Sequence, residues 1–328
     1  MSSSNNHGFN TVYNSQLPKR ERRNWYRRIA IAACCVILAL IATLLIALAI
    51  GHAVTSATPG QGGPGEDTRP VTNGAVEYEN ATFDADDTKA GALILVDGNH
   101  AYAAPSTPSH LGYISNAFTT PGAYEPGLSD RMDKVAADAL AQMLTAQNKA
   151  NGDPLMIRYA YMTKDNANFP SGTTSTDELC TGLVVDLRLY QFEAGKNNSD
   201  LSANPTVQTW FTENAHKYGF VPAPQGSTTY YRYVGVAHAT YMYQNDLTLA
   251  DYLDDLTDHG FKNQLEVTGA DGNRYKIYYV AVSEATEVSV PTNYECTVSG
   301  TNMDGIVVTV NLSAPIAAPV DTTAASLN

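Results

Sequence analysis

The chain has 328 residues and a formal net charge of −13, and this length admits one or two globular domains beside a targeting segment. Its first 28 residues hold six positive side chains and one negative one, so the rest of the chain carries −18. A surface this acidic argues against a partner made of nucleic acid or anionic lipid, although it is also typical of an ordinary soluble domain.

The first recognisable element is an uncharged apolar run at residues 29–50. Its 22 residues would form a helix roughly 33 Å long, which is enough to cross the hydrocarbon core of a bilayer. The basic arm at 1–28 is expected to stay in the cytoplasm, because positively charged flanks are retained there. We therefore predict a single-pass anchor in the cell membrane and an extracytoplasmic remainder. A cleaved signal peptide is the alternative, although its apolar region is usually only about 7–15 residues.

The remainder begins with a glycine- and proline-rich linker at 51–73 and continues as a mixture of short strands and helices. Apolar periodicity and turn residues place a helix at 130–150, a second from Asn204-Pro205 to Gly219, and a third from Thr248 to Gly260. Predicted strands lie at 92–96, 155–161, 182–190, 230–237, 275–282 and 305–312. Because helices and strands do not alternate regularly, the pattern indicates an α+β fold.

Two cysteines, Cys180 and Cys296, lie in the part expected outside the membrane. An oxidising compartment would permit a disulfide between them. Two separate thiols are equally consistent with the sequence, since spacing alone does not set their distance.

Four segments carry a family resemblance. They read W-F-T-E-N-A-H-K-Y-G-F at 210–220, Y-R-Y-V-G at 231–235, L-T-L-A-D-Y-L at 247–253 and T-G-L-V-V-D at 181–186. In order and spacing they resemble the VanY-type D-alanyl-D-alanine carboxypeptidases, zinc enzymes that trim peptidoglycan stem peptides. The resemblance implies the small α+β fold shared with Hedgehog signalling domains. We expect this VanY-like domain at 74–265, a β appendage at 266–313 and a disordered tail at 314–328.

The resemblance also implies a zinc ion held by two histidines and one aspartate, with a glutamate as general base. The two histidine positions are filled here by Leu179 and Tyr230, while the aspartate remains as Asp186. Ser227 stands at the position of the base, and Met162 at that of an arginine that pairs with the substrate carboxylate. Leucine has no lone pair and a neutral phenol is a poor ligand, so we expect a degenerate site with no resident cofactor.

The sequence therefore predicts a membrane-anchored, non-catalytic homologue that recognises stem peptides or a wall-synthesis partner of a bacterium. Tyr161, Tyr230 and Tyr231 are candidate contacts, because tyrosine offers apolar area together with a hydroxyl group. Ordinary packing within strands is the alternative explanation for these residues. Two other functions stay open: an active D,D-carboxypeptidase with an atypical metal site, and a structural or adhesive surface domain.

Overall fold

The computed structural model describes residues 75–103, 110–118, 130–152, 155–166, 168–170, 177–190, 199–224 and 226–316, and the backbone of 124–125. The chain divides into Met1–Thr72 and Asn73–Asn328, and every described residue belongs to the second unit. The predicted arm, anchor and linker lie outside the described residues, as does nearly all of the predicted tail. Within the described ranges, no helix is both long and apolar enough to span a membrane.

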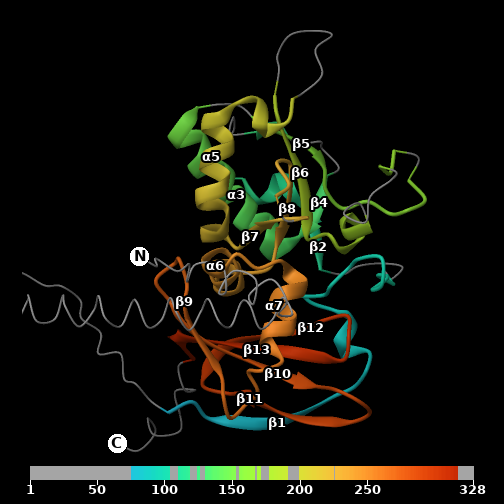
Figure 1. Ribbon diagram of the computed structural model, residues 1–328, viewed down its shortest axis with the longest axis vertical. Helices are drawn as coiled ribbons and strands as arrows, with labels where there is room; N and C mark the ends of the chain where they lie inside the picture. Colours follow the sequence, from blue (N-terminus) through green and yellow to red (C-terminus); the bar gives the residue numbers. More distant parts are fainter. Residues whose placement is uncertain are drawn as a thin grey trace, which may run out of the picture. The chain divides into compact units, whose positions relative to one another are not determined.

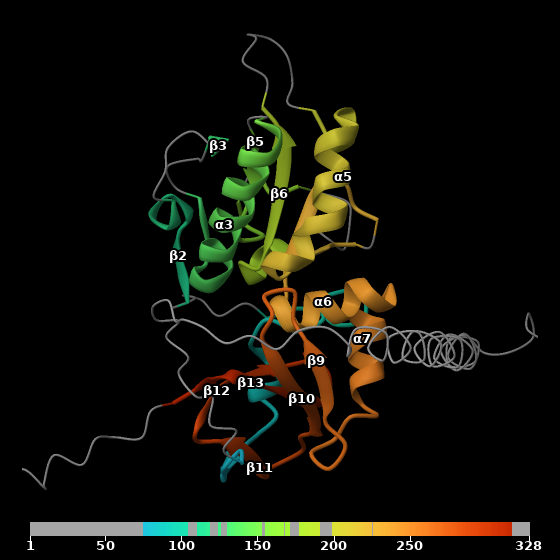
Figure 2. The ribbon, with the colours of Figure 1, turned by 90° about the vertical axis from the view of Figure 1, so that its left-hand side faces the viewer.

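A five-stranded sheet in the order β3-β5-β6-β8-β7 forms the centre of the first group of elements (Figure 1). Its strands are β3 (Tyr124–Glu125), β5 (Leu155–Tyr159), β6 (Val184–Leu189), β7 (Phe220–Pro222) and β8 (Tyr230–Tyr233). Helices α3 (Lys134–Asn151) and α5 (Pro205–Asn214) pack on one face of the sheet (Figure 2). Their side chains Leu140, Leu144 and Phe211 form a core with Val185, Leu187 and Tyr231 of the sheet. Because side chains alternate along a strand, Asp186 and Tyr230 belong to the opposite face.

Both helices of this group have the ends that their sequences favour. The side chain of Asp133 accepts hydrogen bonds from Val135 and Ala136 at the start of α3, and Gly152 ends the helix in the left-handed conformation. Asn204 caps α5 in the same way and Pro205 is its first residue, as predicted. A short 3-10 helix, η5 (Ala215–Tyr218), then leads to Gly219, where φ is 81°.

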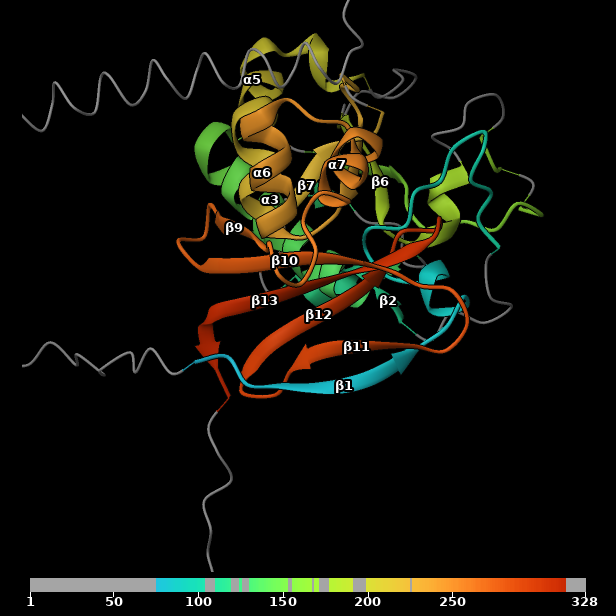
Figure 3. The same cartoon turned by 60° about the horizontal axis from the view of Figure 1, so that its bottom comes forward.

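The second group is built on an antiparallel sheet in the order β12-β13-β10-β9. The strands are β9 (Leu265–Thr268), β10 (Arg274–Ala281), β12 (Tyr294–Gly300) and β13 (Gly305–Pro315). Helices α6 (Val236–Asn245) and α7 (Leu249–Leu256) pack against one face of this sheet, where Ile277 of β10 and Val307 of β13 are buried. The neighbouring residues Tyr278 and Val308 point to the other face, where β1 (Tyr78–Phe83) and β11 (Thr286–Pro291) form a two-stranded layer (Figure 3).

The remaining described elements are short. They are the pair β2 (Leu111–Tyr113) and β4 (Arg131–Asp133) and the 3-10 helices η1 (Asp87–Lys89), η2 (Ile114–Ala117), η3 (Glu178–Thr181) and η4 (Leu201–Ala203). Since β1 pairs with β11, the beginning of the predicted 74–265 domain packs with the predicted β appendage.

Two strand predictions were wrong, and the helix predicted at 130–150 begins only at Lys134, because Arg131–Asp133 form β4. Residues 92–96 are irregular, and 93–96 are buried. Their backbone groups bind side chains and loops instead of a neighbouring strand; the N–H of Leu93, for example, donates to Ser299 Oγ at 2.8 Å. The strand predicted at 230–237 ends at Tyr233, and α6 begins at Val236. Gly235, with φ of 90°, allows the chain to change direction between the two, which the aromatic and valine-rich pattern did not reveal.

Candidate functional site

Asp186, where the family resemblance places a retained metal ligand, lies on β6 directly opposite Tyr230 of β8. Its side chain is fully buried, and both of its carboxylate oxygens are occupied by one guanidinium group. Arg188 Nε donates to Oδ1 at 2.9 Å and a terminal nitrogen donates to Oδ2 at 3.2 Å. Arg188 also forms an ion pair with Asp200, which precedes η4. Asp186 is therefore half of a buried bidentate ion pair.

The titration behaviour of these groups follows from burial and from the neighbouring charges. Burial raises the pKa of Asp186, and the opposing pull comes mainly from Arg188 and, more weakly, from Arg158 of β5. The pKa of Tyr230 is raised to about 12, first by burial and then by the negative charge of Asp186. Tyr230 consequently stays a neutral phenol at physiological pH and offers no anionic oxygen to a metal ion.

Two of the altered family positions are neighbours in the structure. The carbonyl of Leu179, in η3, accepts a hydrogen bond from the backbone N–H of Met162 at 3.3 Å. Leu179 itself is fully buried and therefore acts as a packing residue. The two segments therefore lie side by side, although neither side chain offers a usual zinc ligand or a cation for a carboxylate.

Ser227, at the position of the general base, has a local structural task. Its hydroxyl oxygen accepts hydrogen bonds from the backbone N–H groups of Thr229 at 3.3 Å and Tyr230 at 3.0 Å. These contacts organise the turn that leads into β8. A serine hydroxyl used in this way is no substitute for a carboxylate base.

These side chains do not fit a zinc ion. Structural and catalytic zinc sites need at least three nitrogen, sulfur or carboxylate ligands, and here one position is leucine, one a neutral phenol and one an ion-paired carboxylate. Across the described part of the chain, no group of three or more histidine, cysteine, aspartate or glutamate side chains is placed to hold a metal ion.

The two buried histidines of the described residues lie elsewhere and are engaged with aromatic and hydroxyl groups. His216 stacks on Tyr243 with ring centroids 3.8 Å apart, and burial lowers its pKa to about 4. His238 contacts the hydroxyl groups of Tyr252 at 2.7 Å and Thr309 at 3.0 Å. Neither is part of a ligand cluster around Asp186.

A second buried ion pair connects β8 with η3 and the segment at 92–94, and the sequence analysis did not identify it. Arg232 is only 1% exposed and donates to Glu178 Oε1 at 2.6 Å and to the carbonyl of Ile94 at 2.7 Å. Burial raises the pKa of Glu178, while Arg232 pulls it in the opposite direction. Arg232 belongs to the quoted Y-R-Y-V-G segment, and Glu178 directly precedes Leu179. The sequence offered one signal for this pair, because Arg232 is a charged residue inside an otherwise aromatic and apolar strand.

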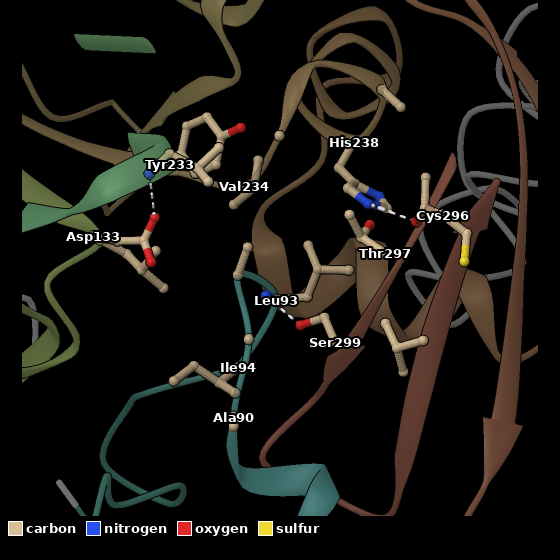
Figure 4. Close-up of a pocket in the computed structure, with 18 of the residues that line it drawn as sticks. Ala90, Leu93, Ile94, Asp133, Tyr233, Val234, His238, Cys296, Thr297 and Ser299 are labelled. Carbon is tan, nitrogen blue, oxygen red and sulfur yellow. Dashed lines mark hydrogen bonds between the residues drawn. The ribbon is translucent and has the colours of Figure 1, made fainter. Parts of the chain in front are cut away.

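A cavity with a volume of about 1010 Å³ lies apart from Asp186 (Figure 4). It is bounded by Asp133 and Tyr233 on one side and by β12 residues Cys296, Thr297 and Ser299 on the other. Its walls are mostly apolar, with contributions from Ala90, Leu93, Ile94, Val234, Val236, Ala237 and Val298. Of the residues predicted for the site, it includes Cys296 but none of the altered family positions.

A smaller cavity of about 560 Å³ is lined by Ser227, Tyr231, Glu178 and Arg232 among others. Tyr231 is 1% exposed, and its ring packs on Phe211 at a centroid distance of 5.1 Å. The packing explanation therefore accounts for Tyr231, whereas Tyr161 and Tyr230 are partly exposed.

Cys180 and Cys296 are both free thiols in the structure, which matches the two-thiol alternative. Cys180 is buried in η3, whereas Cys296 is half-buried on β12. Burial raises the pKa of both thiols.

Comparison with known proteins supports the family resemblance. A D-alanyl-D-alanine carboxypeptidase of Enterococcus faecium is 25% identical over 256 residues, which are 71% of this chain and 79% of that protein. No family model matches the chain.

Among solved structures, the D,D-dipeptidase VanXYg in complex with a D-Ala-D-Ala phosphinate analog superposes with a TM-score of 0.59. It is 20% identical and covers 72% of this chain and 99% of its own, which shows a shared fold. The D,D-pentapeptidase VanY of a VanB-type cassette, solved with Zn(II), is 22% identical, has a TM-score of 0.35 and covers 49% of this chain and 98% of its own.

Proposed function

We propose that this chain, a relative of the VanY-type D-alanyl-D-alanine carboxypeptidases, binds peptidoglycan stem peptides without cleaving them. The observation that carries the proposal is the bidentate ion pair between Arg188 and Asp186, the one family ligand position that keeps its residue type. With Leu179 and Tyr230 at the other two positions, the site has neither a ligand set nor a general base.

Stem peptides are the preferred ligand because of the relatives. VanXYg was solved with a D-Ala-D-Ala phosphinate analog, and a VanY enzyme with D-alanine-D-alanine. A scaffold can keep a ligand class after losing its chemistry, since binding and catalysis depend on different groups. The predicted anchor at 29–50 would hold the domain on the outer side of the cell membrane, beside the wall.

We place the peptide in the cavity of about 1010 Å³, so its binding place would lie apart from the family's metal positions. Small-ligand sites are usually concave, mostly apolar and of about 300–1,000 Å³, with a few polar groups that set orientation. Here the polar groups include Asp133, Lys89 and Glu295. Thr297 is exposed on β12 and lines the cavity, so a large side chain at that position would fill the space at little cost to folding.

The full chain, purified in detergent, should contain no stoichiometric zinc and release no D-alanine from muramyl pentapeptide. It should bind the same peptide in calorimetry. Thr297→Trp should weaken that binding at least tenfold, whereas Thr268→Trp, on the opposite edge strand β9 of the same sheet, should leave it unchanged.

Stoichiometric zinc together with D-alanine release would replace this proposal by the active-enzyme alternative. A folded chain that binds neither the pentapeptide nor purified wall fragments would favour the structural or adhesive alternative.

A further inference from the structure

We infer that Arg188 has taken the electrostatic place of the metal ion, and that it excludes a metal independently of the missing ligands. The inference rests on the proposed function, because it assumes that Asp186 stands at the family's aspartate position. A fully buried carboxylate needs a compensating cation, and within this fold family zinc supplies one. In this chain the cation is part of the same strand.

The geometry of β6 makes this replacement possible. Residues two apart on a strand project from the same face, so Arg188 reaches Asp186 without any rearrangement of the backbone. Its planar guanidinium matches the two carboxylate oxygens, at 2.9 and 3.2 Å. The arginine side chain is 13% exposed, so this pair is largely withdrawn from water.

The guanidinium is also held from its other side. A second terminal nitrogen pairs with Asp200, whose side chain is 52% exposed. Arg188 therefore bridges a buried acid and a surface acid. This second contact opposes rotation of the arginine away from Asp186.

A metal ion entering here would have to displace Arg188. If it did not, a divalent charge would lie beside a monovalent cation with one carboxylate shared between them. Restoring the lost ligands alone should then produce only a weak site. The competing view is that Arg188 is an incidental surface partner that swings away once proper ligands are present.

Zinc affinity separates these views. The restored variant is the full chain with three changes, Leu179→His, Ser227→Glu and Tyr230→His. A second variant adds Arg188→Met as a fourth change. Affinity is measured by competition with a chromophoric chelator. We expect the fourth change to tighten zinc binding about 10- to 100-fold, the range over which partners of metal ligands tune affinity.

Arg158→Met is the matched control in the same restored background. Arg158 is an exposed arginine on the adjacent strand β5, and its charge also reaches Asp186, but it makes no hydrogen bond to that carboxylate among the contacts of the described residues. If charge alone matters, both arginine changes should help equally. If occupation of the carboxylate matters, the Arg158 change should improve affinity less than about threefold.

Asp200→Asn provides a second route that leaves the buried residues intact. It should loosen Arg188 and tighten zinc binding by the restored variant several-fold, at a half-exposed position where folding is not at stake. The inference would be overturned if neither Arg188→Met nor Asp200→Asn changes the zinc affinity of the restored variant. Unchanged circular dichroism would show that these chains are folded. D-alanine release by the unmodified chain, or failure of that chain to bind the pentapeptide, would instead sink the proposed function, so the two failures are distinguishable.

Discussion

Replacing Arg232 by methionine tests whether the buried Arg232–Glu178 pair holds the two motif segments together. The guanidinium joins η3, β8 and the irregular segment at 92–94, since it binds Glu178 at 2.6 Å and the carbonyls of Ala92 and Ile94 at 3.2 and 2.7 Å. Methionine keeps much of the length of the side chain but offers no donor, so three acceptors lose their partner.

The expected cost is about 3–5 kcal/mol, the usual effect of removing one partner from a buried ion pair. Because Arg232 and Glu178 are 1% and 8% exposed, solvent would compensate for little of the loss. A domain of this kind is stable by roughly 5–15 kcal/mol, so the variant should lose a large share of its stability but still fold at low temperature.

Urea unfolding of the full chain, followed by far-ultraviolet circular dichroism, measures this cost. Glu178→Gln and the double variant complete a double-mutant cycle, in which we expect a coupling energy of about 2 kcal/mol or more. A cost below about 1 kcal/mol, or single effects that simply add, would refute the reasoning.

The loss of unfolding free energy caused by Arg232→Met should also depend on pH. Without Arg232 nothing opposes the effect of burial, so the pKa of Glu178 rises further above its usual value. A carboxyl whose pKa is raised in the folded state loses stabilisation as pH rises through that range. The Arg232→Met variant should therefore be less destabilised at pH 5 than at pH 8.

Two further predictions concern the second group of elements. Burial lowers the pKa of His238 to about 4, so the stabilisation from its neutral form should be complete above about pH 6.5 and be lost as pH falls toward 4. His238→Gln should flatten that part of the urea-unfolding profile, and an unchanged slope would contradict the assignment. Gly300→Ala would place a Cβ atom 2.2 Å from the backbone of Thr88 and should cost about 1–3 kcal/mol in thermal unfolding. Gly98→Ala, which meets nothing within 4 Å, should change stability by less than about 0.5 kcal/mol, and equal effects would refute the packing argument.

Local signals in the sequence were sufficient for several elements. The Asn204-Pro205 pair and the Thr248 cap located the starts of α5 and α7, because a capping side chain binds backbone groups only two or three residues away. The strand predictions failed where partners are distant in sequence. Residues 92–96 are as apolar as a strand, yet their hydrogen-bonding partners lie in β8, in β12 and just after β12, which no local pattern encodes.

The candidate site shows the same division. The identities of Leu179, Ser227 and Tyr230 were enough to predict lost zinc chemistry, since ligand capacity belongs to the side chain itself. The ion pair of Asp186 with Arg188 could not be predicted from residue identities. A carboxylate two residues before an arginine is common on exposed strands, and only burial on the sheet turns that pair into a fixed ion pair.

The sequence by itself determined the family resemblance, the acidic character and the residue types that stand where the resemblance places metal ligands, because these depend on composition and motif order. The tertiary structure decided which cation accompanies Asp186, which tyrosine belongs to the core and where the large cavity lies. Those features arise when strands and loops far apart in the chain are brought together, and the energies that fix them come from burial and long-range pairing that local sequence does not contain.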